Sequence, residues 1–239
     1  MTTSRSARLL RAANRHARLV HALACALMAL PALLIAWDWA RGTLATNPLE
    51  QLIRAHGEWA LNLLLAVLAI TPLRHALVHA SRRLDRRWGR RWADWNWLIR
   101  LRRPIGLASF FYALAHVGLY AAFDVGWDWS EFAIDLRNKP FVLAGIATFA
   151  LLLPLAITST DAWMRRLKRG WKRLHTLVYP AAMLAVLHFV WLSKPGVQRP
   201  YIYGLLLALL LLYRVAVRWL ARDTAVAPPP DEEAAEREQ

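Results

Sequence analysis

IGLASFFYALAHVGLYAAF, residues 105–123, contains no Asp, Glu, Lys or Arg. About 20 apolar residues in an α-helix span the hydrocarbon core of a bilayer, and in lipid a run of this length satisfies its backbone N–H and C=O groups as a helix. Arg102 and Arg103 lie just before the run, and Asp124 follows it. Residues 105–123 therefore predict a transmembrane helix with charged ends.

Five further apolar runs lie on either side of this one, and 57% of the whole chain is hydrophobic. They cover residues 19–37, 58–73, 141–158, 175–192 and 201–220. The run 58–73 is the shortest of the six and contains Glu58, so hydropathy fixes the ends of this helix only to within several residues. The predicted fold class is all-α, a polytopic membrane helix bundle of about six transmembrane helices.

The charge balance is strongly basic, with 31 Lys and Arg against 16 Asp and Glu and a net charge of +15. A basic chain can bind nucleic acid, but here the cations form short clusters between long apolar runs. Such clusters are typical of cytoplasmic loops in membrane proteins. We therefore expect contact with membrane lipid and no nucleic-acid partner.

The loops alternate between cation-rich and cation-poor segments, which predicts the orientation. Basic clusters occur at the N-terminus, in 74–103, in 165–169 and at the end of the last run. The intervening segment 124–139 carries Asp124, Asp128, Glu131 and Asp135. Because short Lys- and Arg-rich loops stay in the cytoplasm, we expect both termini there and three loops outside, as in a bacterial inner-membrane protein.

The chain divides into three parts on composition. Residues 1–18 form a basic cytoplasmic N-terminus, 19–222 the transmembrane domain, and 223–239 an acidic, Pro-rich cytoplasmic tail that we expect to be disordered. A cleaved signal peptide is the alternative for the first run. We favour a membrane anchor, because the run is long for a signal core and no small-residue cleavage site follows it before Trp37.

Histidines within the membrane are the residues that most clearly indicate chemistry. Cys25 is the only cysteine, so neither an intramolecular disulfide nor a cysteine-ligated metal site is available. His116 lies about 12 residues into the run 105–123, roughly 18 Å from its cytoplasmic end at 1.5 Å per residue. Ionisable residues at such a depth are costly and usually face a functional site, so we favour a functional role over a structural hydrogen bond.

His175 and His188 share the run 175–192 and are separated by 13 residues, or about 20 Å of helix. They cannot bind one metal ion together. If His175 lies at the cytoplasmic boundary, His188 lies at the depth of His116, so His116 and His188 are the predicted axial pair of one haem. Two imidazoles without carboxylate or cysteine ligands suit haem iron better than hydrolytic zinc.

Two other histidines have open roles. His175 is either an axial ligand of a second, inner haem, facing His75 or His79, or a contact to a propionate or another cofactor. His56, at the outer end of the second run, is a ligand, a contact to a partner or quinone, or a capping residue. Pro180 lies between His175 and His188 and is expected to disturb the helix there.

Arg102 and Arg103 also have two alternative roles. They anchor the third helix at the cytoplasmic face, or they bind the phosphate of a cofactor, for which a pair of guanidinium groups is well suited.

Several short motifs are specific in combination. They are NP at 47–48, HGEWAL at 56–61, TPLR at 71–74, RR at 102–103, GL at 106–107, YALAH at 112–116, PLAITS at 154–159, WKRLHTLVY at 171–179 and HFVW at 188–191. Through them the chain, from about residue 47 to 203, resembles the MsrQ (YedZ) family of the ferric-reductase-like transmembrane superfamily. One departure is Pro104-Ile105 after the arginine pair, which puts the flavin affinity in question.

The resemblance implies a haem b subunit that takes electrons from the quinone pool, or from a cytosolic flavin reductase. It would pass them to a periplasmic molybdopterin protein-methionine-sulfoxide reductase, on which the sulfoxide is reduced. The haem-linked histidines of the family fall on His116, His175 and His188. Its flavin mononucleotide (FMN) site falls on Arg102 and Arg103. Residues 19–222 would then be the haem domain.

Two other functions fit parts of the pattern. A self-contained ferric or superoxide-producing reductase shares the haem core but needs a cytosolic flavin and nicotinamide domain, for which the segment after Arg222 is too short. A cofactor-free permease or assembly factor would use the histidines as a proton path, and would lack haem absorbance.

Overall fold

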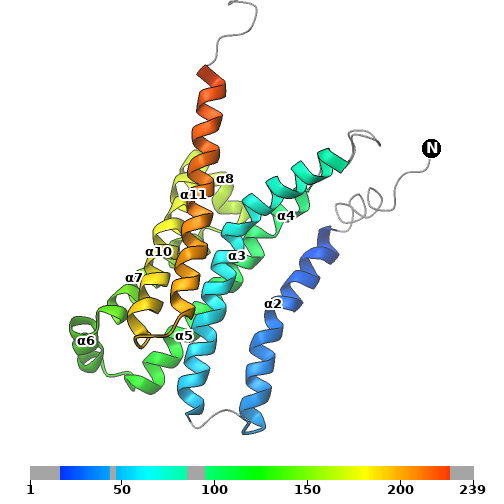
Figure 1. The fold of residues 1–239 in the computed structure, drawn as a ribbon. Coiled ribbons are helices and arrows are strands. Elements are labelled where there is room, and N and C mark those ends of the chain that lie inside the picture. Colours follow the sequence, from blue (N-terminus) through cyan, green and yellow to red (C-terminus); the bar gives the residue numbers. More distant parts are fainter. Residues whose placement is uncertain (1–16, 44–46, 85–94, 227–239) are drawn as a thin grey trace, which may run out of the picture.

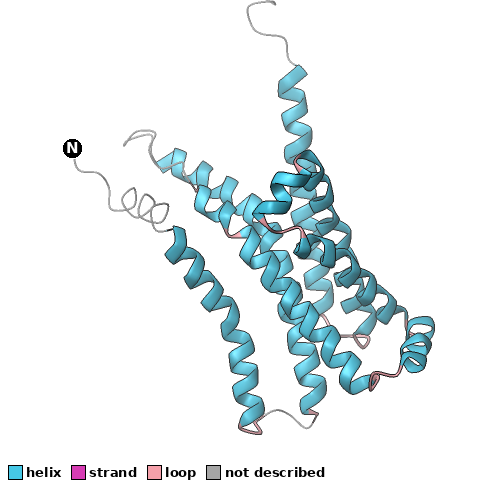
Figure 2. Cartoon of the chain, turned by 180° about the vertical axis from the view of Figure 1, so that it is seen from behind, coloured by secondary structure: helices cyan, strands magenta, loops and turns pink. Residues whose placement is uncertain are grey.

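The computed structural model describes residues 17–43, 47–84 and 95–226, and these form helices joined by short loops (Figure 1). In chain order the helices are α2 (Ala17–Ala40), α3 (Pro48–Leu84), α4 (Asn96–Arg100), α5 (Arg102–Leu119), the π-helix η2 (Tyr120–Asp124), α6 (Trp129–Asn138), α7 (Pro140–Ile157), α8 (Asp161–Leu167), α9 (Arg169–Leu174), the 3-10 helix η3 (His175–Leu177), α10 (Val178–Leu192) and α11 (Arg199–Val226). The described residues contain no strand, which agrees with the all-α prediction (Figure 2).

Six helical segments within the described residues are long and apolar enough to cross a membrane. They are His21–Ala40, Pro48–Ser81, Asn96–Asp124, Pro140–Ile157, Arg169–Leu192 and Arg199–Leu220. Each contains most or all of one of the six predicted runs, so the predicted six-helix membrane bundle is confirmed.

The apolar surface of α11 shows why such a fold needs lipid. Leu205, Leu209 and Leu212 are each more than half exposed, whereas Leu207 and Leu210 are buried against the bundle. The exposed leucines recur at helical spacing, so one whole face of α11 is apolar and unpaired. In water this face would be costly, but in a bilayer it meets hydrocarbon.

The second transmembrane helix, whose ends hydropathy left open, extends well beyond its apolar run. α3 has 37 residues and is the longest helix in the described part of the chain, although its apolar run 58–73 is the shortest. The run marks only the portion that lipid requires to be apolar. Good helix formers such as Leu, Glu, Arg and Ala continue the helix beyond both ends, and Pro72 lies inside it without ending it.

Four helices form the centre of the bundle. α3 packs most extensively on α5, α7 packs most extensively on α10, and α5 and α7 join the two pairs. Buried residues from α3, α7, α10 and α11 make one apolar core, including Leu64, Leu68, Leu152, Ala181 and Leu207. The core therefore lies among helices that are far apart in sequence.

Tyr112 of α5 anchors α2 to the bundle through hydrogen bonds to the α2 backbone. The Tyr112 hydroxyl donates to the Met28 carbonyl at 2.8 Å and accepts from the Ala32 N–H at 3.0 Å. In an uninterrupted helix these two backbone groups would bond to each other. The hydroxyl is thus inserted into the hydrogen-bond ladder next to Pro31, and α2 bends near its middle (Figure 1).

The bundle has two chemically different ends. We call the end with α6, the last residues of α2 and the first residues of α3 the α6 end, and the opposite end, with α4, α8 and α9, the arginine-rich end (Figure 1). The orientation of these ends relative to the cytoplasm remains a prediction. α11 continues to Val226, past the predicted boundary at 222, while residues 1–16 and 227–239 of the predicted terminal segments lie outside the described residues.

Candidate functional site

A cavity of about 430 Å³ lies between α3, α5, α7 and α10, in the half of the bundle nearer the α6 end. Its volume is in the range of sites that hold organic cofactors. Apolar side chains form most of its wall, among them Leu61, Leu64 and Phe149, and charged side chains line it at the α6 end.

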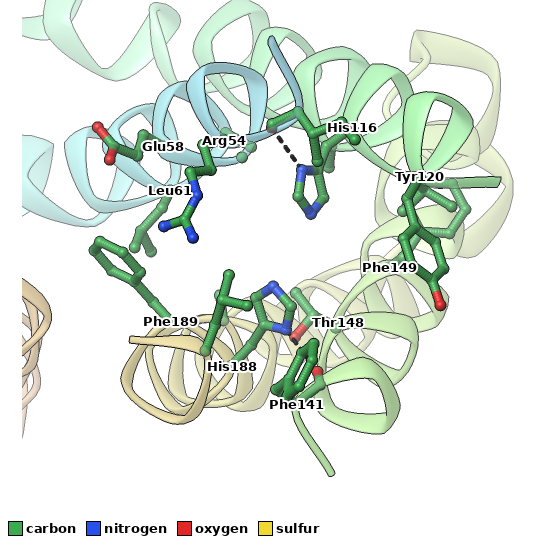
Figure 3. Close-up of a pocket in the computed structure, with 18 of the residues that line it drawn as sticks. Arg54, Glu58, Leu61, His116, Tyr120, Phe141, Thr148, Phe149, His188 and Phe189 are labelled. Atoms are coloured by element: carbon green, nitrogen blue, oxygen red, sulfur yellow. Dashed lines mark hydrogen bonds between the residues drawn. The ribbon is translucent and has the colours of Figure 1, made fainter. Parts of the chain in front are cut away.

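His116 and His188 face each other across this cavity (Figure 3). Their ring centroids are 6.0 Å apart, and the ring planes are inclined at 81°. Two imidazole nitrogens that bind one metal from opposite sides at about 2 Å each place their ring centres about 6 Å apart. The spacing of the two rings therefore suits a single metal ion between them.

A backbone hydrogen bond orients each ring. The Nδ1–H of His116 donates to the Ile53 carbonyl at 2.8 Å, and that of His188 donates to the Phe141 carbonyl at 2.6 Å. With Nδ1 protonated, the lone pair is on Nε2, and in Figure 3 the second nitrogen of each ring points into the cavity. Such a backbone contact is the usual outer partner of a metal-binding histidine, and it makes the ring a stronger ligand.

A glycine lies beside each imidazole. A Cβ atom built on Gly57 would lie 3.0 Å from the His116 ring, and one built on Gly145 would lie 2.9 Å from the His188 ring. Each glycine is four residues after the carbonyl that orients the same ring. The two halves of the site thus repeat one arrangement: a carbonyl and a glycine on one helix (α3 or α7), and a histidine on its partner helix (α5 or α10).

Sequence reasoning identified the two histidines but not these glycines. Gly57 lies next to His56 in the motif at 56–61, and of these two residues only the histidine has a side chain that can bind a metal. The spacing of four residues between a carbonyl and a glycine has no chemical signature in the sequence. It becomes visible only when the opposite helix is in place.

The donor set of the cavity suits haem. Among the described residues, no three His, Cys, Asp or Glu side chains gather in a way that could hold a metal ion, so the cavity offers two imidazoles and a largely apolar space. A metal held by two opposed ligands has four positions left in the plane between them. The flat, apolar macrocycle of a haem supplies those four ligands and fits such walls.

His175 lies at the arginine-rich end and does not line the cavity. Its Nδ1 donates to the Trp171 carbonyl at 3.1 Å, its ring stacks on Trp171 at 3.8 Å between centroids, and its Nε2 is buried without a hydrogen-bond partner. His75 bonds to the Tyr213 hydroxyl at 2.9 Å, and His79 is exposed. In the described residues His175 thus has no ring contact or hydrogen bond with His75 or His79.

His56 points away from the cavity that its neighbour Gly57 lines. Its Nδ1 donates to the Leu52 carbonyl at 2.8 Å, and its ring lies 5.9 Å from the Tyr112 ring. The side chain is therefore part of the contact between α3 and α5 near α2, and it is not positioned to bind a metal in the cavity.

Arg102 and Arg103 face different surroundings. Arg103 forms an ion pair with Asp161 at 2.6 Å, whereas Arg102 donates to the Thr71 hydroxyl at 2.8 Å and lies within electrostatic range of Arg74 and Arg214. Arg214 donates to the Tyr179 hydroxyl and to the Leu68 carbonyl, each at 2.9 Å.

Arg74, Arg102 and Arg214 form what we call the three-arginine cluster. The Nε of each is buried without a hydrogen-bond partner, and within the described residues none of the three forms an ion pair with a carboxylate. Three like charges with unused donors make a site for an anion with several oxygens, such as a phosphate. Arg74 and Arg214 were missed at the sequence level, because their charges were already explained as membrane anchors.

The chain is similar to several known proteins. Residues 56–186 match the family described as "Ferric reductase like transmembrane component". The chain is 41% identical over 221 residues to a protein of Xanthomonas axonopodis pv. citri, covering 89% of this chain and 92% of that protein. It is 44% identical over 190 residues to one of Xanthomonas campestris pv. campestris strain B100 (78% and 80%) and 42% identical over 182 residues to one of Herminiimonas arsenicoxydans (75% and 76%). All three are named "Protein-methionine-sulfoxide reductase heme-binding subunit MsrQ".

Proposed function

Because the chain belongs to the ferric-reductase-like transmembrane family, and within it to the MsrQ subunits, we propose that it is the haem-binding, electron-carrying membrane subunit of a protein-methionine-sulfoxide reductase system. The observation that carries the proposal is the pair of opposed imidazoles of His116 and His188, 6.0 Å apart across a cavity within the membrane. Residues 19–222 form the haem domain in this proposal.

His116 and His188 hold the iron of a haem b through Nε2. Bound there, the haem supplies reversible one-electron transfer within the membrane. The chain contributes the orientation of both rings through Ile53 and Phe141, and a dry apolar wall that keeps water from the iron. The hydrogen bond at Nδ1 of each ring makes its Nε2 a stronger ligand, and stronger ligands favour ferric iron.

The three-arginine cluster is proposed to bind the phosphate of FMN. Arg102 belongs to the cluster, and the unused Nε donors of Arg74, Arg102 and Arg214 support a multidentate phosphate contact. The ion pair of Arg103 with Asp161 makes Arg103 the weaker of the two originally expected phosphate ligands. His175 lies four residues before Tyr179, which bonds to Arg214. The Nε2 of His175 has no hydrogen-bond partner and is available to a cofactor at this end.

The proposed direction of electron flow follows from the orientation. With the arginine-rich end in the cytoplasm, electrons enter from the quinone pool or from a cytosolic flavin reductase. They leave at the α6 end to a periplasmic catalytic subunit that carries molybdopterin. Methionine sulfoxide in the periplasm needs reducing power from across the membrane, and a haem in the outer half of the bilayer shortens the last transfer.

The visible spectrum of the detergent-purified chain tests the haem proposal. We expect a low-spin b-type spectrum with haem identified by the pyridine haemochrome assay, and its loss in His116→Ala and in His188→Ala. His21→Ala is the matched control, because His21 is exposed on α2, and it should keep the wild-type spectrum. Absence of haem from the wild-type chain after expression with ample haem would favour the permease or assembly factor. Wild-type haem content in both variants would overturn the ligand assignment.

The same assay gives the number of haems per chain, which decides the role of His175. One haem per chain, unchanged in His175→Ala, supports a contact to another cofactor. Two haems in the wild type and one in His175→Ala would make His175 the ligand of an inner haem.

A further inference from the structure

The opening of the haem cavity has a chemical asymmetry that the histidines do not explain. Toward the arginine-rich end the wall consists of side chains such as Leu64, Leu152 and Thr148. At the α6 end the lining includes Asn47, Glu50, Arg54, Asp124 and Lys139. One edge of the cavity is therefore charged, and the remainder is almost entirely apolar.

Arg54 is the cation of this edge that reaches into the cavity. It comes from α3, one residue after the carbonyl that orients His116, and its guanidinium group extends into the open space between α3 and α10 (Figure 3). Its side chain is 48% exposed. The group thus lines the cavity and is also accessible from outside the bundle.

Neighbouring residues hold Arg54 in this position. Its Nε and Nη2 both lie 2.7 Å from Oε1 of Glu50. Glu50 in turn accepts from the Asn47 side-chain amide at 3.1 Å, while its own N–H donates to the Asn47 side-chain oxygen at 3.3 Å. This arrangement leaves Nη1 of Arg54 for another acceptor, so the arginine is pre-oriented without being saturated.

The other charges near the opening are partly engaged elsewhere. Glu58 also lines the cavity but pairs with Arg199 at 3.2 Å, and Lys139 pairs with Asp135 at 2.7 Å. Arg54 is consequently the positive group best placed to meet a ligand in the cavity.

A haem b is itself asymmetric, since two propionate carboxylates lie on one edge of an otherwise apolar disc. Resting on the haem function above, we propose that Arg54 binds the haem propionates and so sets the rotation of the disc about the axis joining His116 and His188. A carboxylate turned toward Leu64 and Leu152 would be buried without a partner, which is strongly unfavourable. Turned toward the α6 end, it meets a guanidinium group in a charge-assisted hydrogen bond.

The position of Arg54 has a second consequence for the iron. A positive charge at the propionate edge stabilises the reduced haem, which carries one positive charge less than the oxidised haem. Removal of that charge should lower the midpoint potential of the haem and weaken its tendency to accept electrons. Arg54 is thus a positioning residue that also tunes the potential.

The propionate contact can be tested by binding, without any catalytic assay. The full chain, prepared without haem in detergent, is titrated with haem b and with haem b dimethyl ester, in which both propionates are esterified. We expect the wild type to prefer the free acid and Arg54→Gln to lose about tenfold or more of that preference, as for one charge-assisted hydrogen bond. Arg54→Lys should keep part of it.

Arg41→Gln is the matched control, because Arg41 is an exposed arginine at the same end of the bundle and does not line the cavity. It should keep the wild-type preference and midpoint potential. A low-spin spectrum in Arg54→Gln shows that the variant is folded and that both histidines bind iron. An unchanged preference in such a sample would overturn the propionate contact alone, whereas a wild-type chain that binds neither porphyrin would overturn the haem function as well.

Discussion

At the scale of single residues, the two glycines beside the histidines are the least conspicuous part of the site. Gly57 and Gly145 let the imidazoles lie directly against the helix whose carbonyl orients them. A methyl group at either position would meet ring atoms at about the closest distance that real Cβ atoms show. The ring would have to move, and the ring is the proposed iron ligand.

We therefore expect Gly57→Ala and Gly145→Ala to weaken haem binding and to convert part of the haem from low-spin to high-spin, because one Nε2 no longer reaches the iron. Optical and electron paramagnetic resonance spectra of the purified variants check this. Gly118→Ala, on the same helix as His116 and with open space around it, is the control. A low-spin spectrum at wild-type haem content in both glycine variants would contradict the role of the close contact.

Arg102 and Arg103 are adjacent in sequence, and their variants allow a direct comparison of flavin binding. Arg102→Gln should remove most of the bound flavin, because Arg102 belongs to the three-arginine cluster, and Arg103→Gln should remove much less, because Arg103 pairs with Asp161. Fluorescence of the flavin released from purified protein measures the loss.

Both arginine variants should keep a wild-type haem spectrum. His116 follows Arg102 by 14 residues, or about 21 Å of helix, so the two sites do not share contacts. Equal flavin loss in the two variants would argue that the ion pair of Arg103 opens on binding.

At the scale of elements, the carboxylate of Asp135 links α6 to η2 and to the residue before α7. Asp135 lies 2.7 Å from Nζ of Lys139 and accepts from the Tyr120 hydroxyl at 2.6 Å. These contacts hold the pKa of Asp135 below its ordinary value, with the hydrogen bond from Lys139 as the largest cause and that from Tyr120 next. Because Tyr120 lines the cavity between His116 and His188, α6 is linked to the wall of the proposed haem site.

The sign of the pH dependence follows from that depressed pKa. The contribution of Asp135 to stability is complete above the ordinary carboxyl pKa of about 4 and is lost as the pH falls through the lower folded value. Asp135→Asn should therefore lower the thermal unfolding midpoint at pH 7, and the difference from wild type should shrink at pH 3. Thermal unfolding followed by haem absorbance gives both midpoints. A difference that grows toward acid would contradict the assignment.

At the scale of the whole molecule, the two ends of the bundle are expected on opposite sides of the membrane. The arginine-rich end is expected in the cytoplasm and the α6 end in the periplasm. In a Cys25→Ser background, Glu131→Cys on α6 should react with a membrane-impermeant maleimide added to spheroplasts, and Lys168→Cys should react only after lysis. The reverse pattern would invert the direction of electron flow proposed above.

Much of this protein was predictable from local properties of its sequence. Six transmembrane helices follow from hydropathy, and the equal depth of His116 and His188 follows from a rise of 1.5 Å per residue, because both depend on one segment at a time. Helix ends were less predictable, because α3 extends beyond its apolar run at both ends. The break near Pro180 appears as the 3-10 turn His175–Leu177, since a proline there cannot donate to the Thr176 carbonyl.

What only the tertiary structure decided is which side of each helix meets which neighbour. In lipid, an apolar residue suits the bilayer and the bundle interior alike, so hydropathy does not mark the inward face. The facing of His116 and His188 at 6.0 Å, the carbonyl and glycine beside each ring, and the separation of His175 from His75 all depend on lateral packing. The different partners of Arg102 and Arg103 also depend on lateral packing. Adjacent residues on a helix point about 100° apart, and the neighbouring helices determine what each side chain meets.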